Sequence, residues 1–163
     1  GLEDKELIRN KDDELNGRII KNGGKIYLIP SLITKYYARD KISKVRKMFY
    51  QYGLYKPLVN KKLGSPATAR QFFPLVFVLG LIFGAVLSCF YWVIAVIYFS
   101  VIFLYVFFAC YFTAKSIKKT KVFKLFLFQP ATYFVVHTSY GWGYLVGIYK
   151  ILMHRPFNAE SNR

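Results

Sequence analysis

The chain has 163 residues, of which 55% are hydrophobic and 20% aromatic, and its formal net charge is +16. This apolar content excludes a disordered basic tail. The placement of the charge excludes a soluble monomer, because residues 72–114 contain no Asp, Glu, Lys or Arg, whereas residues 1–71 carry 16 Lys and Arg against 7 Asp and Glu. An uncharged block of this length can cross a hydrocarbon layer twice, at roughly 20 residues per crossing.

The first predicted element is a helix over residues 10–22. Asn10 is a good N-cap residue, and Gly23 with Gly24 supplies a C-terminal stop. Three acidic residues fill the first turn, where the helix dipole favours anions: Asp12, Asp13 and Glu14.

The next segments predict a strand, a second helix and a linker. Residues 25–29, Lys-Ile-Tyr-Leu-Ile, form an expected strand that ends at Pro30. A basic amphipathic helix is expected over about 41–55, either at the membrane interface or as a solvated face of a soluble domain. Pro57 should end that helix, and residues 58–71 are interpreted as a linker.

The uncharged block 72–114 predicts a transmembrane hairpin with helices over about 72–90 and 93–113. Tyr91 and Trp92 between them are amphipathic residues that prefer a membrane interface. Residues 115–124 form a lysine-rich loop directly after the hairpin. The positive-inside rule therefore places both basic flanks, including residues 1–71, in the cytoplasm.

A third apolar segment covers residues 125–153 and is followed by a polar tail over 154–163. Pro130 should break this segment near its start. The segment could span the membrane, with Gly143 and Gly147 allowing close helix packing. It could also be a re-entrant or interfacial helix that leaves the C-terminus in the cytoplasm, and the cationic flank of Lys150 and Arg155 mildly favours this second interpretation.

The acidic cluster at residues 12–14 is the one concentrated group of carboxylates in the chain. In one interpretation it only matches the helix dipole. In the other, a carboxylate at the helix N-terminus stays ionised and accepts a proton from a bound hydroxyl, as a general base does. The spacing of the residues leaves both interpretations open.

The order of residues from Gly1 to Ile19, continued through Gly23–Pro30, resembles a segment of the family 2 glycosyltransferases. The similarity is to the bacterial exopolysaccharide branch typified by succinoglycan biosynthesis ExoA-like proteins. That family has a pattern acid-Asp-x-acid-Leu-x-x-Arg whose Asp is the catalytic base. Carried over, the resemblance implies that Asp12 is the base, with Asp13 as second candidate, and that Glu14 and Arg18 bind substrate.

A second family motif, Gln-x-x-Arg-Trp, falls on the following helix in an altered form. Met48 replaces its Gln and Gln51 its Arg, and Tyr52 keeps the final aromatic. The resemblance assigns substrate binding to Gln51 and Tyr52, and the altered motif fits transfer of a single sugar better than processive polymerisation. Two further stretches are similar to that branch: Arg70–Pro74 and His137–Gly143.

The resemblance implies an α+β fold: residues 1–57 would be the C-terminal end of a GT-A type α/β catalytic domain, followed by an α-helical membrane domain. It implies an inverting transferase of the bacterial inner membrane that uses a nucleotide sugar and a lipid-linked or saccharide acceptor in exopolysaccharide synthesis. A divalent cation, Mg or Mn, is expected in the full-length enzyme with ligands outside this chain, so no metal ligands are assigned here. The chain is then the rear part of a longer enzyme and inactive alone.

A different class of function stays open. The chain could be a small non-enzymatic membrane protein whose basic segments bind anionic membrane lipid or a protein partner, since each surface Lys or Arg contributes about 1 kcal/mol of attraction. Nucleic acid is not an expected partner, because the aromatic residues lie mostly in the membrane block, where no base could stack on them.

Overall fold

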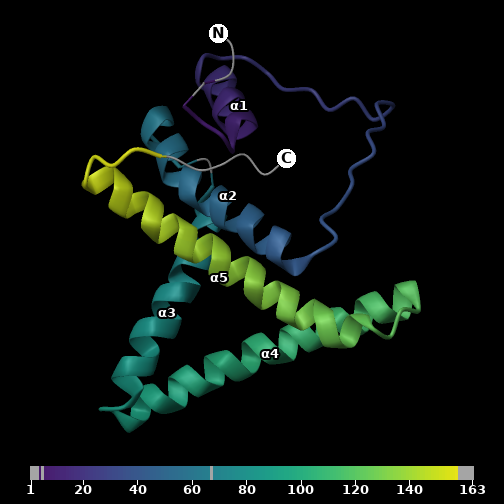
Figure 1. The fold of residues 1–163 in the computed structure, drawn as a ribbon, viewed down its shortest axis with the longest axis vertical. Helices are drawn as coiled ribbons and strands as arrows, with labels where there is room; N and C mark the ends of the chain where they lie inside the picture. Colours follow the sequence, from purple (N-terminus) through teal and green to yellow (C-terminus); the bar gives the residue numbers. More distant parts are fainter. Residues whose placement is uncertain (1–3, 5, 67, 158–163) are drawn as a thin grey trace.

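The computed structural model describes residues 4, 6–66 and 68–157, and within them the chain is built from helices and loops. In chain order these are α1 (Lys11–Lys21), α2 (Ile42–Leu63), the short 3-10 helix η1 (Ala69–Phe72), α3 (Phe73–Ser88), α4 (Trp92–Thr120) and α5 (Leu125–Leu152) (Figure 1). Helices α3, α4 and α5 enclose a triangle in Figure 1, and α2 lies across α5 on the side that faces α1.

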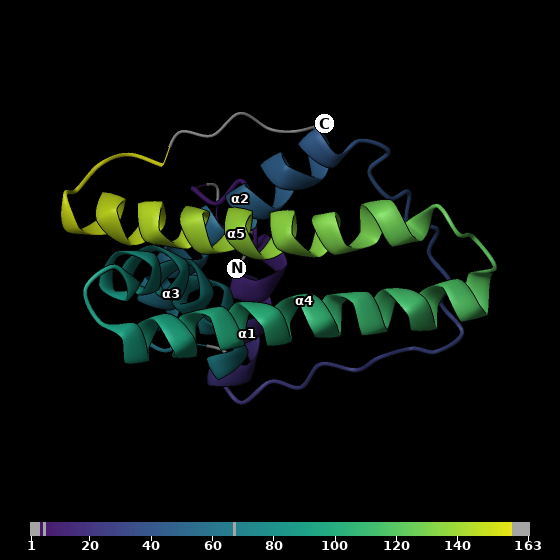
Figure 2. The same ribbon diagram turned by 90° about the horizontal axis from the view of Figure 1, so that it is seen from below.

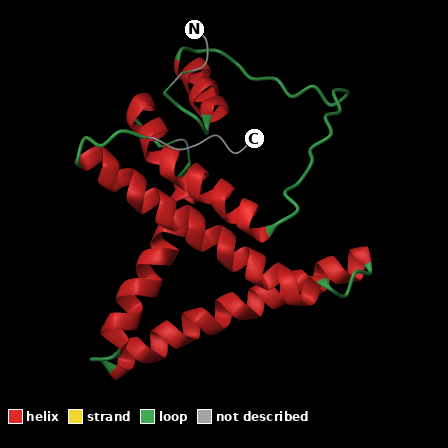
Figure 3. Ribbon diagram, viewed as in Figure 1, coloured by secondary structure: helices red, strands yellow, loops and turns green. Residues whose placement is uncertain are grey.

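The predicted α+β fold class is wrong for the part of the chain that the structure describes, which contains no strand (Figure 3). Residues 25–29, the predicted strand, lie in the long loop between α1 and α2. Their side chains are exposed, with Leu28 at 91% of its full accessible area. A run of β-branched and aromatic residues favours a strand only when another strand pairs with it, and no described segment does so here.

Two prolines that were expected to end helices lie inside them. Helix α2 continues through Pro57 to Leu63, so the first six residues of the predicted linker are helical. Pro57 is buried, and its ring lies where α5 passes at Gly147. Packing against α5 thus offsets the backbone hydrogen bond that a proline removes. Pro130 likewise lies within the continuous helix α5.

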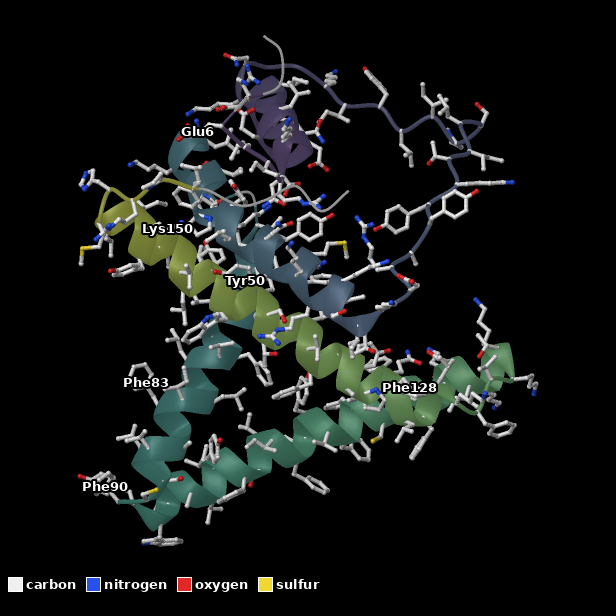
Figure 4. The ribbon with its side chains drawn as sticks, viewed as in Figure 1. Glu6, Tyr50, Phe83, Phe90, Phe128 and Lys150 are labelled. Atoms are coloured by element: carbon white, nitrogen blue, oxygen red, sulfur yellow. The ribbon has the colours of Figure 1, made fainter. Side chains whose placement is uncertain are left out.

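The crossing of α2 and α5 is made by glycines on both helices. A Cβ atom added at Gly53 would collide with the backbone of Tyr140 on α5, and one added at Gly143 would collide with the carbonyl of Tyr50 on α2. Gly147 contacts the carbonyl of Leu54 in the same way. Tyr50 marks this crossing in Figure 4. The two helices therefore run in the same direction with their backbones in contact, which side chains larger than hydrogen would prevent.

The apolar core lies along α2, between the N-terminal segment and α5. Leu7 and Tyr55 are fully buried, and the cluster continues along α2 with Leu54, Leu58, Val59 and Leu63. The Tyr55 hydroxyl donates a hydrogen bond to the carbonyl of Phe157 at 3.1 Å, so the chain after α5 closes over the same core. The burial of Leu7 and the residues of α2 is what holds the N-terminal segment to the helical body.

Helices α3 and α4 form a hairpin with a tight turn at Cys89–Tyr91 and confirm the predicted pair of apolar helices. Within the part of the chain that the structure describes, two helical stretches are long and apolar enough to cross a membrane, Ala69–Ser88 and Trp92–Thr120. Only 11% and 6% of their most apolar windows are buried inside the protein, whereas a core helix of a soluble domain would be mostly covered. Phe83 and Phe90 project from the outer side of this hairpin (Figure 4).

Helix α4 runs six residues beyond the predicted hairpin, so Lys115 to Thr120 are helical and the connection to α5 shortens to residues 121–124. From there α5 returns alongside α4 (Figure 2). Helices α3, α4 and α5 meet where the Phe77 ring stacks on Tyr105 at 4.7 Å and lies 6.1 Å from the His137 ring. The Tyr105 hydroxyl and His137 Nδ1 are 2.9 Å apart, so a hydrogen bond between these side chains joins α4 to α5.

The glycine crossing predicts a position-dependent response to alanine. We expect Gly53→Ala or Gly143→Ala to lower the free energy of unfolding by roughly 1–3 kcal/mol, because a methyl group must push two backbones apart. Gly80→Ala on α3 is the matched control: a Cβ there meets nothing within 4 Å, so its unfolding midpoint should stay the same or rise. Thermal unfolding in detergent measures all three, and equal effects at the three positions would contradict the packing described here.

Candidate functional site

The N-terminus of α1 is held against the middle of α2 by hydrogen bonds from Asn10 and Arg9. Asn10 stands at the helix start with a left-handed backbone (φ 59°), and its side chain does not cap α1 as the sequence suggested. Its amide instead donates to the Tyr52 carbonyl at 2.9 Å. Arg9 Nε donates to Gln51 Oε1 at 3.1 Å, and the guanidinium lies 5.9 Å from the Tyr52 ring centroid.

These contacts bring the two sequence motifs together, since the acidic turn of α1 lies beside the helical turn that carries Gln51 and Tyr52. Gln51 is 2% exposed, so its amide is enclosed by the protein and accepts the hydrogen bond from Arg9. Tyr52 is half-buried. Arg9 links the two motifs, although it falls outside both. No local pattern singled out Arg9, because its partners lie 42 or more residues away along the chain.

The three carboxylates of the acidic turn have different surroundings. Glu14 is buried and forms a two-pronged ion pair with Arg18, with both contacts at 3.0 Å. Asp13 pairs with Lys56 of α2 at 2.5 Å, and the Lys56 side chain is only 12% exposed. Asp12 is exposed, and no hydrogen bond or ion pair engages it within the described residues.

Of the three carboxylates, those of Asp13 and Glu14 are each neutralised by a cation, and that of Asp12 is not. A carboxylate that already accepts charge-assisted hydrogen bonds from a cation has fewer oxygen positions open to a ligand. Glu14 and Arg18 stabilise α1 internally, and Asp13 with Lys56 ties α1 to α2. Asp12 is therefore the member of the cluster whose oxygens are available to a ligand in solvent.

A further ion-pair group fixes the chain before α1. Lys62 Nζ contacts Asp4 Oδ2 at 2.7 Å and Glu6 Oε2 at 2.6 Å. The hydrogen bond from Lys62 lowers the pKa of Asp4 below its ordinary 3.8, and the bonds to Asp4 and Glu6 raise the pKa of Lys62 above 10.5. The tether is therefore intact between those values and weakens as the pH falls below about 4 or rises above about 10.5.

The site residues do not form a metal centre. Among the described residues there is no group of three or more His, Cys, Asp or Glu side chains that could hold a metal ion. Of the acidic turn, Asp13 and Glu14 already face Lys56 and Arg18. These residues therefore do not fit the divalent cation that the sequence resemblance implies for the full-length enzyme.

Two hollows of the described structure lie away from Asp12, which lines neither of them. One of about 500 Å³ lies along the later turns of α1 and the residues after it, with Arg18 and Asn22 in its wall. The other, of about 580 Å³, lies between α4 and α5.

Comparison with known proteins gives one informative similarity. No family model matches the chain, and no solved structure matches it. Over 149 residues the chain is 26% identical to a protein of Methanococcus voltae, the dolichyl N-acetyl-alpha-D-glucosaminyl phosphate 3-beta-D-2,3-diacetamido-2,3-dideoxy-beta-D-glucuronosyltransferase. The match covers 91% of this chain and 42% of that protein, so the chain spans less than half the length of the curated relative. The similarity is therefore to a glycosyltransferase, and it supports the general class of the sequence resemblance.

The unequal surroundings of the acids predict unequal effects on stability. We expect Asp13→Asn to lower the free energy of unfolding by about 1–3 kcal/mol, because it leaves the charge of Lys56 largely buried without its partner. Asp12→Asn is the matched control and should change stability by less than about 0.5 kcal/mol, as exposed substitutions do. Chemical unfolding of the two variants compares them. A larger loss for Asp12→Asn would contradict the assignment of Asp13 as the structural acid.

Proposed function

We propose that this chain belongs to a membrane-bound glycosyltransferase that transfers a sugar from a nucleotide-sugar donor to a lipid-linked acceptor at the cytoplasmic face of the membrane. The observation that carries the proposal is the exposed carboxylate of Asp12 on the first turn of α1, where both acidic neighbours form ion pairs. Asn10, at the start of the same helix, donates to the Tyr52 carbonyl. Two further observations support it: the pair of uncovered apolar helices and the similarity to a glycosyltransferase.

In the proposed reaction Asp12 takes the proton from the acceptor hydroxyl as that oxygen bonds to the anomeric carbon of the donor. The bond from this carbon to the nucleoside diphosphate breaks, the diphosphate leaves, and the configuration inverts. A carboxylate at a helix N-terminus lies at the positive end of the helix dipole, which stabilises its negative charge. It can therefore serve as a base without a further activating group.

The remaining residues of the two motifs would position this base and the acceptor. Tyr52 and the Arg9 guanidinium above its ring present a flat, cationic surface beside α1. Glu14 and Arg18 would position Asp12 by stabilising α1. Gln51 would position the Arg9 guanidinium, from which it accepts a hydrogen bond. The proposal assigns neither the donor site nor a divalent cation to residues of this chain. We extend the proposal to the exopolysaccharide branch of family 2 on the strength of the sequence motifs alone.

The test of the base is Asp12→Asn in the complete protein. Turnover should fall by about 10²–10⁴, the usual worth of general-base catalysis, with stability unchanged. Asp13→Asn is the matched control, and at a temperature where that variant is folded its turnover should fall far less. Turnover of Asp12→Asn within about twofold of the wild type would exclude Asp12 as the base and favour a non-enzymatic, lipid-binding role for the basic segments.

The proposed orientation of the hairpin is tested with the cysteines of the chain. In a Cys110→Ser variant, the exposed Cys89 beside the α3–α4 turn should react with a membrane-impermeant maleimide in intact cells. With both cysteines replaced by Ser, Lys121→Cys at the basic end of α4 should react only after permeabilisation, because cationic flanks stay in the cytoplasm. The reverse pattern would put Asp12 on the wrong side of the membrane for a nucleotide sugar.

A further inference from the structure

The hollow between α4 and α5 is lined by aromatic side chains at one end and by lysines at the other. Its wall on α4 follows one face of the helix at spacings of three and four residues: Tyr105, Phe108, Ala109, Phe112, Lys115, Ser116 and Lys119. On α5 the wall includes Tyr133 and His137. From Tyr105 to Lys119 this stripe extends about 20 Å at the helical rise of 1.5 Å per residue. Its volume is about 580 Å³, and Phe108 and Phe112 are each 51% exposed within it.

The change from apolar to cationic falls where the uncharged block ends. Residues 72–114 contain no charged side chain, and Lys115 is the first cation after them. Lys115 and Lys119 lie one helical turn apart on the face that lines the hollow. In a membrane this level is where the phosphate groups of lipids lie, so a lipid chain in the hollow would bring its phosphate to the two lysines.

Polar side chains at the same end complete the hollow. Gln129 Nε2 of α5 donates to Ser116 Oγ at 3.1 Å and lies 2.5 Å from the Tyr133 hydroxyl. Gln129 Oε1 is buried and, among the described residues, has no hydrogen-bond partner. A buried amide oxygen without a partner carries a free-energy cost. Two hydroxyl groups and two ammonium groups thus converge on one end of an aromatic groove.

We propose that this groove binds the lipid of the acceptor, a single long isoprenoid chain that ends in a phosphate. The chain would lie along Phe108 and Phe112, and the phosphate would contact Lys115, Lys119 and the Ser116 hydroxyl. The chemical class of the lipid rests on the proposed function, whereas the groove and its charge rest on the geometry alone. Ordinary anionic phospholipids are attracted by surface lysines alone. The Ser116 and Tyr133 hydroxyls each face Gln129 Nε2 with their oxygen, so their hydrogens can be donated to a phosphate, which favours a specific phosphate at this end.

The experiment measures binding of dolichyl phosphate to the full chain in phosphatidylcholine nanodiscs by native mass spectrometry. Replacing the groove lysines in Lys115→Gln/Lys119→Gln should weaken binding by about 30-fold, since each lysine near a phosphate layer contributes about a fivefold effect. Lys118→Gln/Lys121→Gln removes the same charge from the same end of α4, at positions outside the groove. This control should bind within twofold of the wild type.

A second pair of variants tests the apolar half without changing charge. Phe107 and Phe108 are neighbours with 53% and 51% exposure, and only Phe108 lines the groove. Phe108→Ala should weaken binding roughly three- to tenfold, and Phe107→Ala should leave it unchanged. A tenfold excess of phosphatidylglycerol should not displace the probe. Equal losses in both lysine pairs, or displacement by phosphatidylglycerol, would overturn the site in favour of general attraction to anionic lipid.

The outcome separates this site from the proposed function, because binding requires neither donor nor catalysis. If dolichyl phosphate binds as described but the complete protein transfers no sugar, the groove stands and the glycosyltransferase proposal fails. If Asp12→Asn abolishes transfer to a dolichyl-linked acceptor while Lys115→Gln/Lys119→Gln transfers at the wild-type rate and KM, the function stands and the groove is not its acceptor site.

Discussion

The backbone contact between α2 and α5 is the constraint on which the rest of the molecule depends. Helix α2 carries Tyr52 and Lys56, which fix the acidic end of α1, and α5 packs against both helices of the apolar hairpin. The candidate site is therefore tied to the membrane part through one crossing. Glycines at Gly53, Gly143 and Gly147 let the helices approach until carbonyl groups meet Cα atoms. Because no side chain holds the backbones apart at these positions, many small dispersion contacts form between the two helices.

Charge is divided along the chain in a way that isolates one carboxylate. The excess of cations surrounds the uncharged block and suits the cytoplasmic side of a membrane. Two cations form ion pairs with the acidic turn: Arg18, one turn further along α1, and Lys56 of α2. Each neutralises one acid, and Asp12 is left to solvent at the positive end of the helix dipole. A cluster that looked uniform in sequence therefore consists of two acids that form ion pairs and one, Asp12, that is exposed to solvent.

The features that the sequence predicted correctly depend on local signals. An uncharged run flanked by lysines defined the hairpin, and the acidic turn with Gly23 and Gly24 defined α1 to within a residue at each end. The predictions were wrong where contacts with segments distant in the sequence determine the local structure. Pro57 stays helical because α5 covers it, and residues 25–29 have strand composition without a strand to pair with. The pairing of Lys56 with Asp13 spans 43 residues, and a separation of that size leaves no pattern in a single sequence.

The same crossing explains why a catalytic base could work on so small a helix. An isolated helix of 11 residues is marginal in water, and a base must be held within a fraction of an ångström to be effective. Asn10, Asp13 and Lys21 each bond α1 to α2, with Lys21 donating to the Leu63 carbonyl at 2.9 Å. Helix α2 is in turn locked on α5 by backbone contact. Asp12 thus inherits its position from α2, and α2 reaches the apolar hairpin through α5, which packs against both α3 and α4. A base that acts on a membrane-anchored acceptor, the role proposed for Asp12, requires such a rigid connection.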